Sequence, residues 1–482
     1  MGSRQFEGRI DASLAKELIQ SIKNSQVLVP ESDGYVQSLK RWSDASIKQA
    51  GAVILATSTA DVSTTVLFCR DNHLDFAVCG GGHATSGASS SDGGVVIDLS
   101  RMRQVVVDTE NRTITAQGGC LWADVDTAAG ERGLATVGGT VNHTGIGGLT
   151  LGGGYGWLTG KYGLVIDNLL EVEVVLADGQ VVKASEKENT DLFWALRGAG
   201  QNFGVATQFT YRAFEQKNLV WAGVMVFGRD QIDGVVAFAN HVAKVSQGDA
   251  GMLLVLGTPP LAPAPAIMTP VFFNGPEDKA KDFFAPLLEL GPAVNMTSEM
   301  PYAMVNGLAN AANCHGGRKT MKGPNFSTPI DPRDVSELLD GVTSLLQTIP
   351  DATGSHIVLS FLNSSRTLEQ AHTSAAFANR GDHQVCIVLA QWTEVEHDSA
   401  CREWTRKTCE KLGEISTKKK DSSGLERSSE GVGGYGNFNG SETLPSAREI
   451  FGVNHDRLKT LKERYDPENI FNKSYAFDLT HA

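Results

Sequence analysis

The chain has 482 residues, of which 41% are hydrophobic and 20% are charged, a composition typical of a folded protein with several domains. Its 42 Lys plus Arg against 55 Asp plus Glu give a formal net charge of -13, which disfavours nucleic acid and anionic membranes as partners. Since no run approaches the roughly 18 apolar residues of a membrane span and residues 1–23 lack the apolar centre of a signal peptide, we expect a cytoplasmic protein.

The predicted elements of the first part of the chain alternate between helix and strand. Apolar residues recur at helical spacing over 12–23, and a second helix is predicted over 60–72, beginning near Asp61. Ala177-Asp178-Gly179 has the composition of a hairpin turn that leads into a strand at 181–184. Short apolar runs predict strands at residues 76–79, 95–99, 104–107, 113–116 and 171–176.

Glycine is concentrated between these strands. Of the 52 glycines, 25 lie between residues 80 and 204. Glycine between strands supplies turns with positive φ, or lets the backbone approach a ligand closely. The clusters therefore indicate either plain turns or a backbone surface that lies against a large, flat cofactor.

From about residue 213 the glycine content falls and the pattern becomes that of an α+β domain with its own sheet. Lys418-Lys419-Lys420, beside Asp421 and two serines, predicts a solvated loop. A single helix is predicted over 447–465, ended by Asp466-Pro467. In this part, strands are predicted at 252–256, 356–361 and 384–391, and helices at 334–347 and 398–412.

Several common motifs are missing from the sequence. It contains no G-x-x-x-x-G-K-[ST], H-E-x-x-H or G-x-S-x-G, so a phosphate-loop NTPase, a zinc hydrolase and a serine hydrolase lose their usual support. The glycines at 80–82 and 154–156 depart from the dinucleotide fingerprint, and the match at 431–436 has no strand-to-helix unit around it. Seven scattered cysteines without C-x-x-C indicate no disulfide scaffold, and no metal site is expected.

Two glycine-rich loops have the properties of a cofactor cradle. The loop 80–87 follows a predicted strand, lacks charge, and offers consecutive backbone N–H groups with the hydroxyls of Thr85 and Ser86, a combination that suits a pyrophosphate. The loop 145–156 has many positions without a side chain, so its backbone can lie against a flat ring system.

Read in order, the glycine motifs closely resemble those of the berberine-bridge-type FAD-linked oxidases, members of the vanillyl-alcohol-oxidase flavoprotein superfamily with a PCMH-type FAD-binding domain. The resemblance covers about 50–213 and 431–477 and is diffuse between them. The motifs that carry it are Cys79-Gly-Gly-Gly-His83, the run from Gly138 to Gly156, 161–168, Leu176-Ala-Asp-Gly179, 191–204, Tyr435-Gly-Asn437, 454–458 and 465–471.

The resemblance implies an α+β fold with three parts. Residues 1–212 are expected to form a two-subdomain FAD-binding domain, and 213–430 an α+β substrate domain with an antiparallel sheet. Residues 431–482 are expected to return to the FAD domain and complete it. The oligomeric state is left open.

The resemblance also implies a covalently bound FAD, attached through a ring nitrogen of His83 to the 8α-methyl group. Relatives with a second link use a cysteine whose position is taken here by Val141, and Cys120 belongs to a stretch that does not carry this link, so we expect attachment through His83 only. The residues expected to contact FAD are Cys79, Gly80, Gly81, Gly82, His83, Ala84, Thr85, Ser86, Gly87, Gly139, Thr140, Val141, Thr144, Gly145, Gly147, Gly148, Gly152, Gly153, Gly154, Gly156, Val205, Tyr435 and Asn437.

The implied reaction is hydride transfer from a small organic substrate to the flavin, followed by reoxidation by O₂ to give H₂O₂. Ile387 stands where some relatives have a glutamate base, so the resemblance leaves Tyr155 and Tyr435 as the catalytic residues. A tyrosine with an ordinary pKa near 10 is a poor base at neutral pH, so either a neighbouring cation, with Lys161 and Arg318 as candidates, or the flavin environment is expected to lower that pKa.

The small side chain of Thr144, at a position that gates O₂ in relatives, favours an oxidase over a dehydrogenase. His143 beside it is expected either to face the flavin or to cap a turn. His315, Gln391 and Trp392 are at most candidate wall residues of the substrate site, and an ordinary sheet position explains each of them better.

The substrate class stays open between alcohols, phenolics and other secondary-metabolite intermediates. An oxidative or non-redox cyclase on the same flavoprotein fold is an alternative, and a flavin-binding module without enzyme activity is a third. Release of H₂O₂ distinguishes the oxidase from a non-redox cyclase and from the binding module, and a product of unchanged mass identifies the non-redox cyclase.

Overall fold

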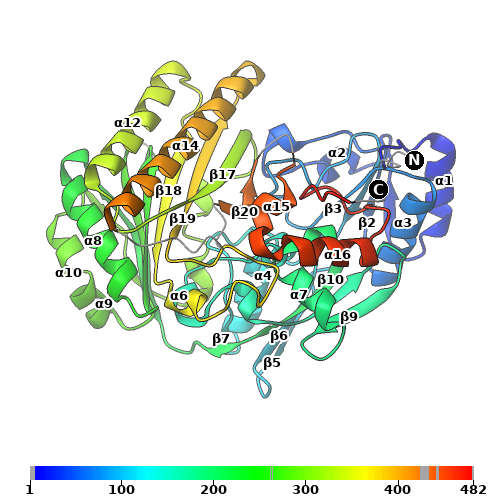
Figure 1. Cartoon of the computed structure of the whole chain (residues 1–482), viewed down its shortest axis with the longest axis horizontal. Helices are drawn as coiled ribbons and strands as arrows, with labels where there is room; N and C mark the ends of the chain where they lie inside the picture. The colour runs from blue at the N-terminus through cyan, green and yellow to red at the C-terminus, as the bar shows by residue number, and fades with distance from the viewer. Residues whose placement is uncertain (1–5, 261, 263, 424–433, 441–443, 480–482) are drawn as a thin grey trace.

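The computed structural model describes residues 6–260, 262, 264–423, 434–440 and 444–479, with the backbone alone for 417–423. The chain forms two masses that meet along one side, a large sheet covered by long helices and a part with two smaller sheets (Figure 1). Among the helices within these ranges, none combines the length and the hydropathy that crossing a membrane requires.

The N-terminal sheet has the order β1-β2-β4-β3, with β2 and β3 both parallel to β4. The strands β2 and β4 are apolar almost throughout and fully buried, as expected for parallel strands covered on both faces. The elements are β1 (Gln26–Leu28), β2 (Ala52–Leu55), β3 (Phe76–Cys79) and β4 (Val95–Asp98), with α1 (Ala12–Ser21), α2 (Tyr35–Ser38) and α3 (Thr59–Asp71).

A second, antiparallel sheet has the order β5-β6-β10-β8-β9. The predicted hairpin between β8 and β9 is present, and Gly179 turns there with φ 78°. The elements of this part are β5 (Val105–Asp108), β6 (Thr113–Gln117), β7 (Leu134–Ala135), β8 (Leu169–Val175), β9 (Val181–Ser185), β10 (Val205–Arg212) and β11 (Phe214–Glu215), with α4 (Trp122–Gly130), α5 (Ile146–Leu151), α6 (Thr159–Tyr162) and α7 (Thr190–Ala199).

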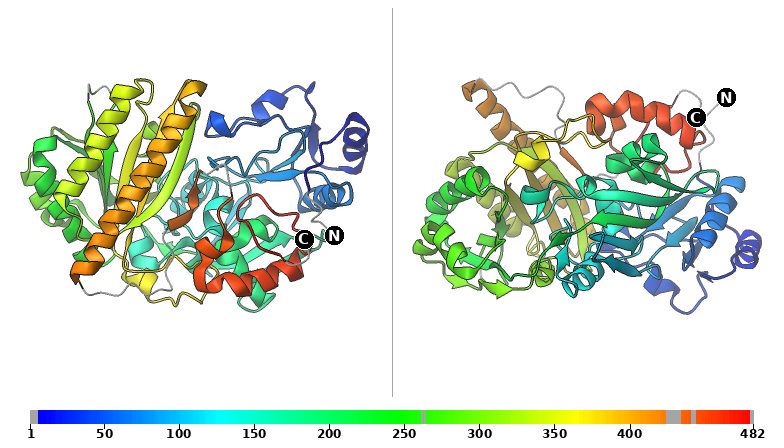
Figure 2. Two further views of the ribbon diagram at one scale, coloured as in Figure 1. Left: turned by 45° about the horizontal axis from the view of Figure 1, so that its top comes forward. Right: turned by 90° about the horizontal axis from the view of Figure 1, so that it is seen from below.

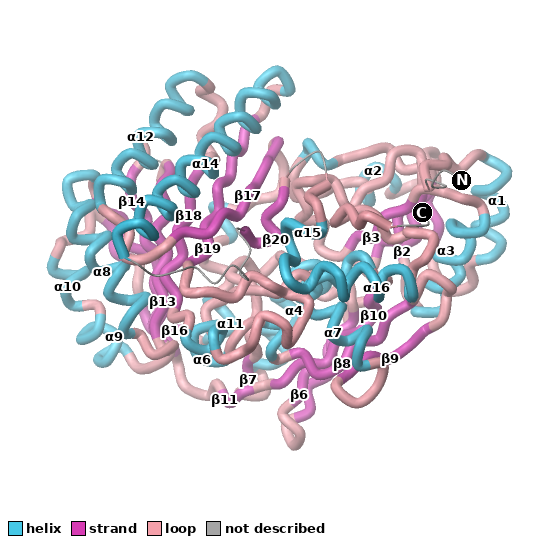
Figure 3. Tube along the Cα trace, viewed as in Figure 1, coloured by secondary structure: helices cyan, strands magenta, loops and turns pink. Residues whose placement is uncertain are grey.

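The large sheet is antiparallel, with the order β15-β12-β14-β13-β18-β19-β17-β20 and β16 beside β12. Its strands stand together as one layer, and α8, α12 and α14 lie over one face of it (Figure 3). The strands are β12 (Val220–Phe227), β13 (Ala250–Gly257), β14 (Ala266–Phe273), β15 (Val294–Asn295), β16 (Ser298–Met300), β17 (Arg318–Phe326), β18 (His356–Leu362), β19 (Gln384–Trp392) and β20 (Gly434–Asn439). The helices are α8 (Ile232–Val245), α9 (Glu277–Phe283), α10 (Ala285–Glu289), α11 (Tyr302–Val305), α12 (Pro332–Thr348), α13 (Ser365–Leu368) and α14 (Asp398–Ser423).

The last part of the chain crosses from one mass to the other. The strand β20 pairs with β17 at the edge of the large sheet, and α15 (Ala447–Phe451) and α16 (His455–Tyr465) then lie against the mass with the two smaller sheets (Figure 2). At the end of α16, Lys462 and Asp466 are fully buried and form an ion pair of 2.5 Å. The same Lys462 ammonium donates to the carbonyls of Asn202 and Phe471, which fixes the C-terminal segment to α7 and its extension.

The α+β class with an antiparallel sheet is confirmed, whereas two local predictions were wrong. Residues 418–420 continue α14 instead of forming a loop, because the polar run has no Gly or Pro to end the helix. The helix predicted over 447–465 is broken at Gly452, whose φ of 47° lies outside the helical region. The boundaries at 212 and 430 stay predictions, and residues 424–433 lie outside the described ones.

Candidate functional site

A cavity lies where the three sheets approach one another. Its wall takes residues from β3, from β10, from β17 and β19, and from β20. The C-terminal segment 470–475 closes another side. Segments that are hundreds of residues apart in the chain therefore form a single hollow.

Most of the residues expected at a flavin line this cavity. They are Gly80, Gly81, Gly82, His83, Ala84, Ser86, Gly139, Thr140, Val141, Thr144, Gly145, Gly147, Gly148, Val205, Tyr435 and Asn437, together with Tyr155. Seven expected residues do not line it, namely Cys79, Thr85, Gly87, Gly152, Gly153, Gly154 and Gly156.

Four of the glycines that do not reach the cavity allow close packing behind it, namely Gly152, Gly153, Gly154 and Gly156. A Cβ at Gly152 would lie 1.9 Å from Oδ1 of Asn437, and one at Gly156 would lie 1.6 Å from the carbonyl oxygen of Gly138. No side chain fits at such distances, so these glycines let the loop and its neighbours approach. Asn437 in turn donates to the Leu149 carbonyl, which joins β20 to α5.

Two other glycine positions form an open cradle. The nearest atom to a Cβ at Gly80 would be the Gly118 carbonyl oxygen at 3.5 Å, and a Cβ at Gly148 would meet no atom within 4 Å. The loops 80–87 and 145–156 contact each other through their backbones, since a Cβ at Gly81 would lie 2.3 Å from the Gly145 nitrogen. The cavity wall is therefore bare backbone at the places where side chains would fill it.

Some hydroxyl groups in and after the loop 80–87 are buried without a hydrogen-bond partner in the described part of the chain. The buried side-chain oxygens of Thr85, Ser89 and Ser90 have no hydrogen-bond partner within the described part of the chain, and Ser89 lines the cavity. Buried polar atoms are rarely left unpaired in native structures. Of these three residues only Ser89 is at the cavity wall, where it and the backbone N–H groups of the loop fit a phosphate of FAD.

His83 is held between aromatic rings. Its ring stacks on Trp42 with the centroids 4.9 Å apart, and its Nε2 lies 2.9 Å from Nδ1 of His143. The ring of His315 lies 5.7 Å from that of His83 and 4.9 Å from that of His143. Burial and the two neighbouring histidines lower the pKa of His83 to about 3, so its imidazole is neutral at pH 7 and can act as a nucleophile.

A buried lysine lies beside this group of rings. The Lys319 ammonium is 5.0 Å from the centre of the Trp42 ring and donates to the carbonyls of Trp42 and Gly316. Burial lowers the pKa of Lys319 to about 8. The positive charge of Lys319 further disfavours protonation of His83.

The two predicted tyrosines meet edge to face at the cavity, with their ring centroids 5.1 Å apart. The Tyr435 hydroxyl accepts hydrogen bonds from the backbone N–H of Gly154 at 3.0 Å and from Nδ2 of Asn437 at 2.8 Å. The Tyr155 hydroxyl donates to the carbonyl of Asn379. Burial raises the pKa of Tyr435 to about 12 and that of Tyr155 further, so both hydroxyls are protonated at neutral pH.

Neither cation proposed to activate the tyrosines is available. Lys161 pairs with Asp249 at 2.6 Å, and Arg318 pairs with Asp398. Since both are engaged in ion pairs elsewhere and neither lines the cavity, the prediction for Lys161 and Arg318 was wrong.

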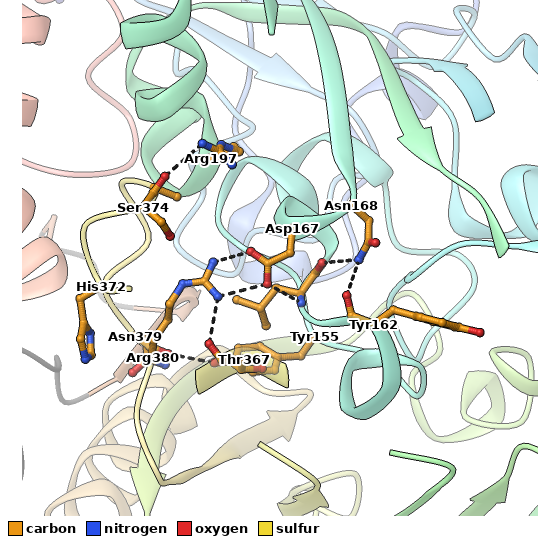
Figure 4. A network of polar contacts seen from close by, with 12 residues as sticks. Tyr155, Tyr162, Asp167, Asn168, Arg197, Thr367, His372, Ser374, Asn379 and Arg380 are labelled. Atoms are coloured by element: carbon orange, nitrogen blue, oxygen red, sulfur yellow. Dashed lines mark hydrogen bonds and ion pairs between the residues drawn. The ribbon is translucent and has the colours of Figure 1, made fainter. Parts of the chain in front are cut away.

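The charge that does lie near Tyr155 belongs to a buried ion pair (Figure 4). The Arg380 side chain is 1% exposed and pairs with Asp167 at 2.5 Å, while a further N–H donates to the Thr367 carbonyl. Asn379, which accepts from Tyr155, is the neighbour of Arg380 in the chain. The ion pair therefore fixes the loop that positions the Tyr155 hydroxyl.

Several wall residues could not be identified from a sequence motif. Trp42 and Asn313 line the cavity, and the indole N–H of Trp42 donates to the Asn313 carbonyl. No signal in the sequence marks either residue. The segment 470–475 begins with the last two residues of the motif 465–471, so that motif was a usable signal for it.

The structure also locates the residues that stand where relatives have a second flavin link, an O₂ gate or a glutamate base. Val141, Thr144 and Ile387 all line the cavity. Cys120 does not line it, is buried, and donates from Sγ to the Gln104 carbonyl. Of the candidate substrate-wall residues, His315 lies beside His83, whereas Gln391 and Trp392 do not line the cavity.

A second cavity adjoins the first and shares Thr140, Tyr155, Ile387 and Phe438 with it. It runs toward the large sheet, and Gln391 and Trp392 are absent from its lining too. None of the described residues that line it is Asp, Glu, Lys or Arg. The indole nitrogen of Trp157, in this wall, is buried without a hydrogen-bond partner among those residues.

Comparison with known families agrees with this geometry. A family described as an FAD binding domain matches residues 50–185, and a family described as berberine and berberine-like matches residues 435–475. An FAD-linked oxidoreductase of Aspergillus terreus, pgmH, is 36% identical and covers 97% of each chain. The (R)-6-hydroxynicotine oxidase of Paenarthrobacter nicotinovorans is 27% identical over 94% of this chain and 96% of its own.

Solved structures share the fold. The 6-hydroxy-D-nicotine oxidase of Arthrobacter nicotinovorans superposes with a TM-score of 0.79 at 27% identity, covering 95% of this chain and 98% of its own. Berberine bridge enzyme in complex with (S)-reticuline reaches a TM-score of 0.82 at 19% identity, covering 98% of this chain and 100% of its own, a likeness of fold alone. The bare-backbone cavity and the relative matched along almost its full length together establish that this chain belongs to the berberine-bridge-type FAD-linked oxidoreductases.

Proposed function

We propose that the chain is an oxidase of an uncharged small organic molecule and that it holds FAD covalently through His83 alone. Bound FAD supplies the hydride acceptor of such an oxidation, with O₂ as the second substrate and H₂O₂ as its product. The observation that carries the proposal is the junction of the two cavities at Tyr155, next to a cradle of bare backbone.

His83 has the properties that covalent attachment requires. Its imidazole is neutral because burial lowers its pKa, and Trp42 and His143 fix the plane of the ring. At the position of the second link in relatives, Val141 has no nucleophilic atom, and Cys120 is buried away from the cavity wall. Attachment through one residue is therefore the arrangement that this chain supports.

Tyr435 is the group best placed to act on a substrate hydroxyl. It lines the flavin-side cavity and accepts two hydrogen bonds, from Gly154 and Asn437. Both bonds favour the phenolate, but burial keeps the hydroxyl protonated at neutral pH. We propose that the Tyr435 hydroxyl stays protonated and donates a hydrogen bond to the substrate oxygen, with Tyr155 completing the same wall, while the hydroxyl proton that the substrate loses on oxidation passes to water.

The second cavity supports the choice of an uncharged substrate. Binding an ion against a wall without Asp, Glu, Lys or Arg costs free energy, whereas an aromatic or alicyclic molecule loses little there. Leu253, Val358 and Phe438 supply apolar contacts.

The test measures both the attachment of the flavin and the oxidation of candidate substrates. The purified protein is expected to be yellow, to carry the added mass of one FAD, and to retain the colour after acid precipitation, while His83→Ala releases its flavin into the supernatant. Anaerobic incubation with neutral phenols and secondary alcohols is expected to bleach the flavin, and admission of O₂ to restore it with release of H₂O₂. A product of unchanged mass without H₂O₂ would contradict the oxidase and favour a cyclase.

A further inference from the structure

The histidines around His83 form a set that flavin attachment alone does not require. One ring nitrogen from each of His83, His143 and His315 can be chosen so that all three lie within 4.8 Å of one another. Attachment of a flavin uses one nitrogen of one of these rings. His143 orients the His83 ring for that attachment, whereas nothing in the proposed oxidation calls on His315.

From this cluster we propose that the chain has a site for a divalent transition-metal ion, formed by His83, His143 and His315. Imidazole nitrogen is a ligand suited to Zn²⁺, Ni²⁺ and Cu²⁺, whereas Mg²⁺ and Ca²⁺ prefer oxygen. Three protein ligands with one position left for water are the ligand number of open zinc sites. The cavity beside His83 supplies the room for that water.

The distances suit such an ion after a small movement of side chains. Zinc–nitrogen bonds of about 2.0–2.1 Å in a tetrahedral site place the nitrogens about 3.3 Å apart. The pair His83 Nε2 and His143 Nδ1 is slightly closer, at 2.9 Å, and the widest separation in the cluster is at most 4.8 Å. His315 is exposed and is followed by Gly316 and Gly317, both with positive φ, so its ring can shift most easily.

The contacts around the cluster leave ligand atoms for a metal ion. The rings of His83 and His143 face each other through Nε2 and Nδ1. Nε2 of His143 has no partner among the described residues and can carry the ring proton while Nδ1 binds the ion. The Lys319 ammonium opposes a second cation, but its bonds to two carbonyls and the nearby Asp44 carboxylate offset part of that repulsion.

The experiment is metal binding by the full-length chain. The protein is produced with limiting riboflavin, and its intact mass establishes that no flavin is attached. Titration with ZnCl₂ and with NiCl₂ is followed by calorimetry and native mass spectrometry. We expect one ion per chain, and at least tenfold weaker binding by each of His143→Ala and His315→Ala, with unchanged circular dichroism.

The control is His241→Ala, which removes an exposed histidine that lies outside the cluster and should bind as the wild type does. Equal affinity of wild type, His143→Ala and His315→Ala, or no binding by a folded wild type, would overturn the proposal. A further arm rests on the proposed function: Zn²⁺ should slow flavin attachment at least tenfold in wild type and less in His315→Ala. If no flavin attaches at all, the proposed function fails while the titration still decides the metal site.

Discussion

Nε2 of His83 lies 2.9 Å from Nδ1 of His143, so one of the two imidazoles must donate its ring proton to the other. With Trp42 stacked on its ring, His83 has little freedom to rotate away from this contact. The His143 ring therefore decides which nitrogen of His83 carries a proton and which has a free lone pair.

Replacing His143 should consequently slow flavin attachment. In His143→Ala we expect the rate of covalent incorporation of added FAD to fall at least tenfold, because His83 loses the partner that sets its tautomer. His143→Asn keeps a polar group near the position of Nδ1 and should recover part of the rate. Intact mass against time measures this, and an unchanged rate in His143→Ala would contradict the assigned contact.

The same cluster should make the flavin-free chain sensitive to acid. Burial lowers the pKa of His83 to about 3 and lowers those of His143 and His315, whereas an unfolded histidine titrates near 6.5. Below pH 6.5 the unfolded chain therefore binds more protons than the folded one, and stability falls as pH falls toward 3.

The measurement is the urea midpoint at pH 7 and at pH 5 for flavin-free wild type and for His83→Asn. We expect the midpoint of wild type to drop more between these values than that of the variant, because the asparagine side chain does not titrate. Carboxylates elsewhere contribute equally to both proteins, so equal drops would show that His83 is solvated.

Gly148 offers a direct test of the cradle. A Cβ there meets no atom within 4 Å, and the residue lies in the helix α5, so Gly148→Ala should fold at least as well as wild type. The added atoms stand on the cavity wall, and flavin content should fall from wild type to Gly148→Ala to Gly148→Leu. Absorbance per chain gives the content, and Gly413→Ala, in the exposed part of α14, should keep it full.

The two tyrosines should differ in their effects on turnover. Tyr435→Phe removes an acceptor shared by Gly154 and Asn437 and the hydrogen bond that we propose to the substrate oxygen, so kcat should fall about 10²–10³-fold. Tyr155→Phe removes the hydrogen bond to the Asn379 carbonyl, and its kcat should fall less than that of Tyr435→Phe. Flavin content measured in parallel separates turnover from cofactor loss. Full turnover by Tyr435→Phe would remove this residue from the mechanism.

The sequence allowed the cradle to be predicted because its residues are close together along the chain. Gly80, Gly81 and His83 follow β3 within a few positions, and the hydroxyls and bare backbone of this loop are visible in the letters themselves. The α+β class followed in the same way from the change of pattern near residue 213.

The surroundings of His83 could not be predicted, because they depend on tertiary packing. Trp42 comes from a stretch with no motif, and His315 reaches His83 only because β17 lies at that edge of the large sheet. The partners of long charged side chains were equally unpredictable. Lys161 pairs with Asp249 and Arg318 with Asp398, residues brought close by packing and not by sequence.

The buried ion pair of Lys462 and Asp466 should hold the segment 470–475 in its place at the cavity wall. Asp466 accepts from the backbone N–H groups of Ile470 and Phe471, the first residues of the segment that lines the cavity. Lys462→Met leaves this carboxylate buried without its cation, which typically costs about 3–5 kcal/mol. We expect that loss in the free energy of unfolding in urea, together with weaker flavin binding.

Two variants distinguish the loss of the Lys462–Asp466 ion pair from a general destabilisation of the helix α16. Lys459→Met, on the same helix α16 and partly exposed, should change stability by less than about 0.5 kcal/mol. The double variant Lys462→Met, Asp466→Asn removes both charges and should be less destabilised than the sum of the two single variants, since no unpaired charge is left inside. If Lys462→Met unfolds within about 1 kcal/mol of wild type, the carboxylate is hydrated and the segment 470–475 is held by its apolar contacts instead.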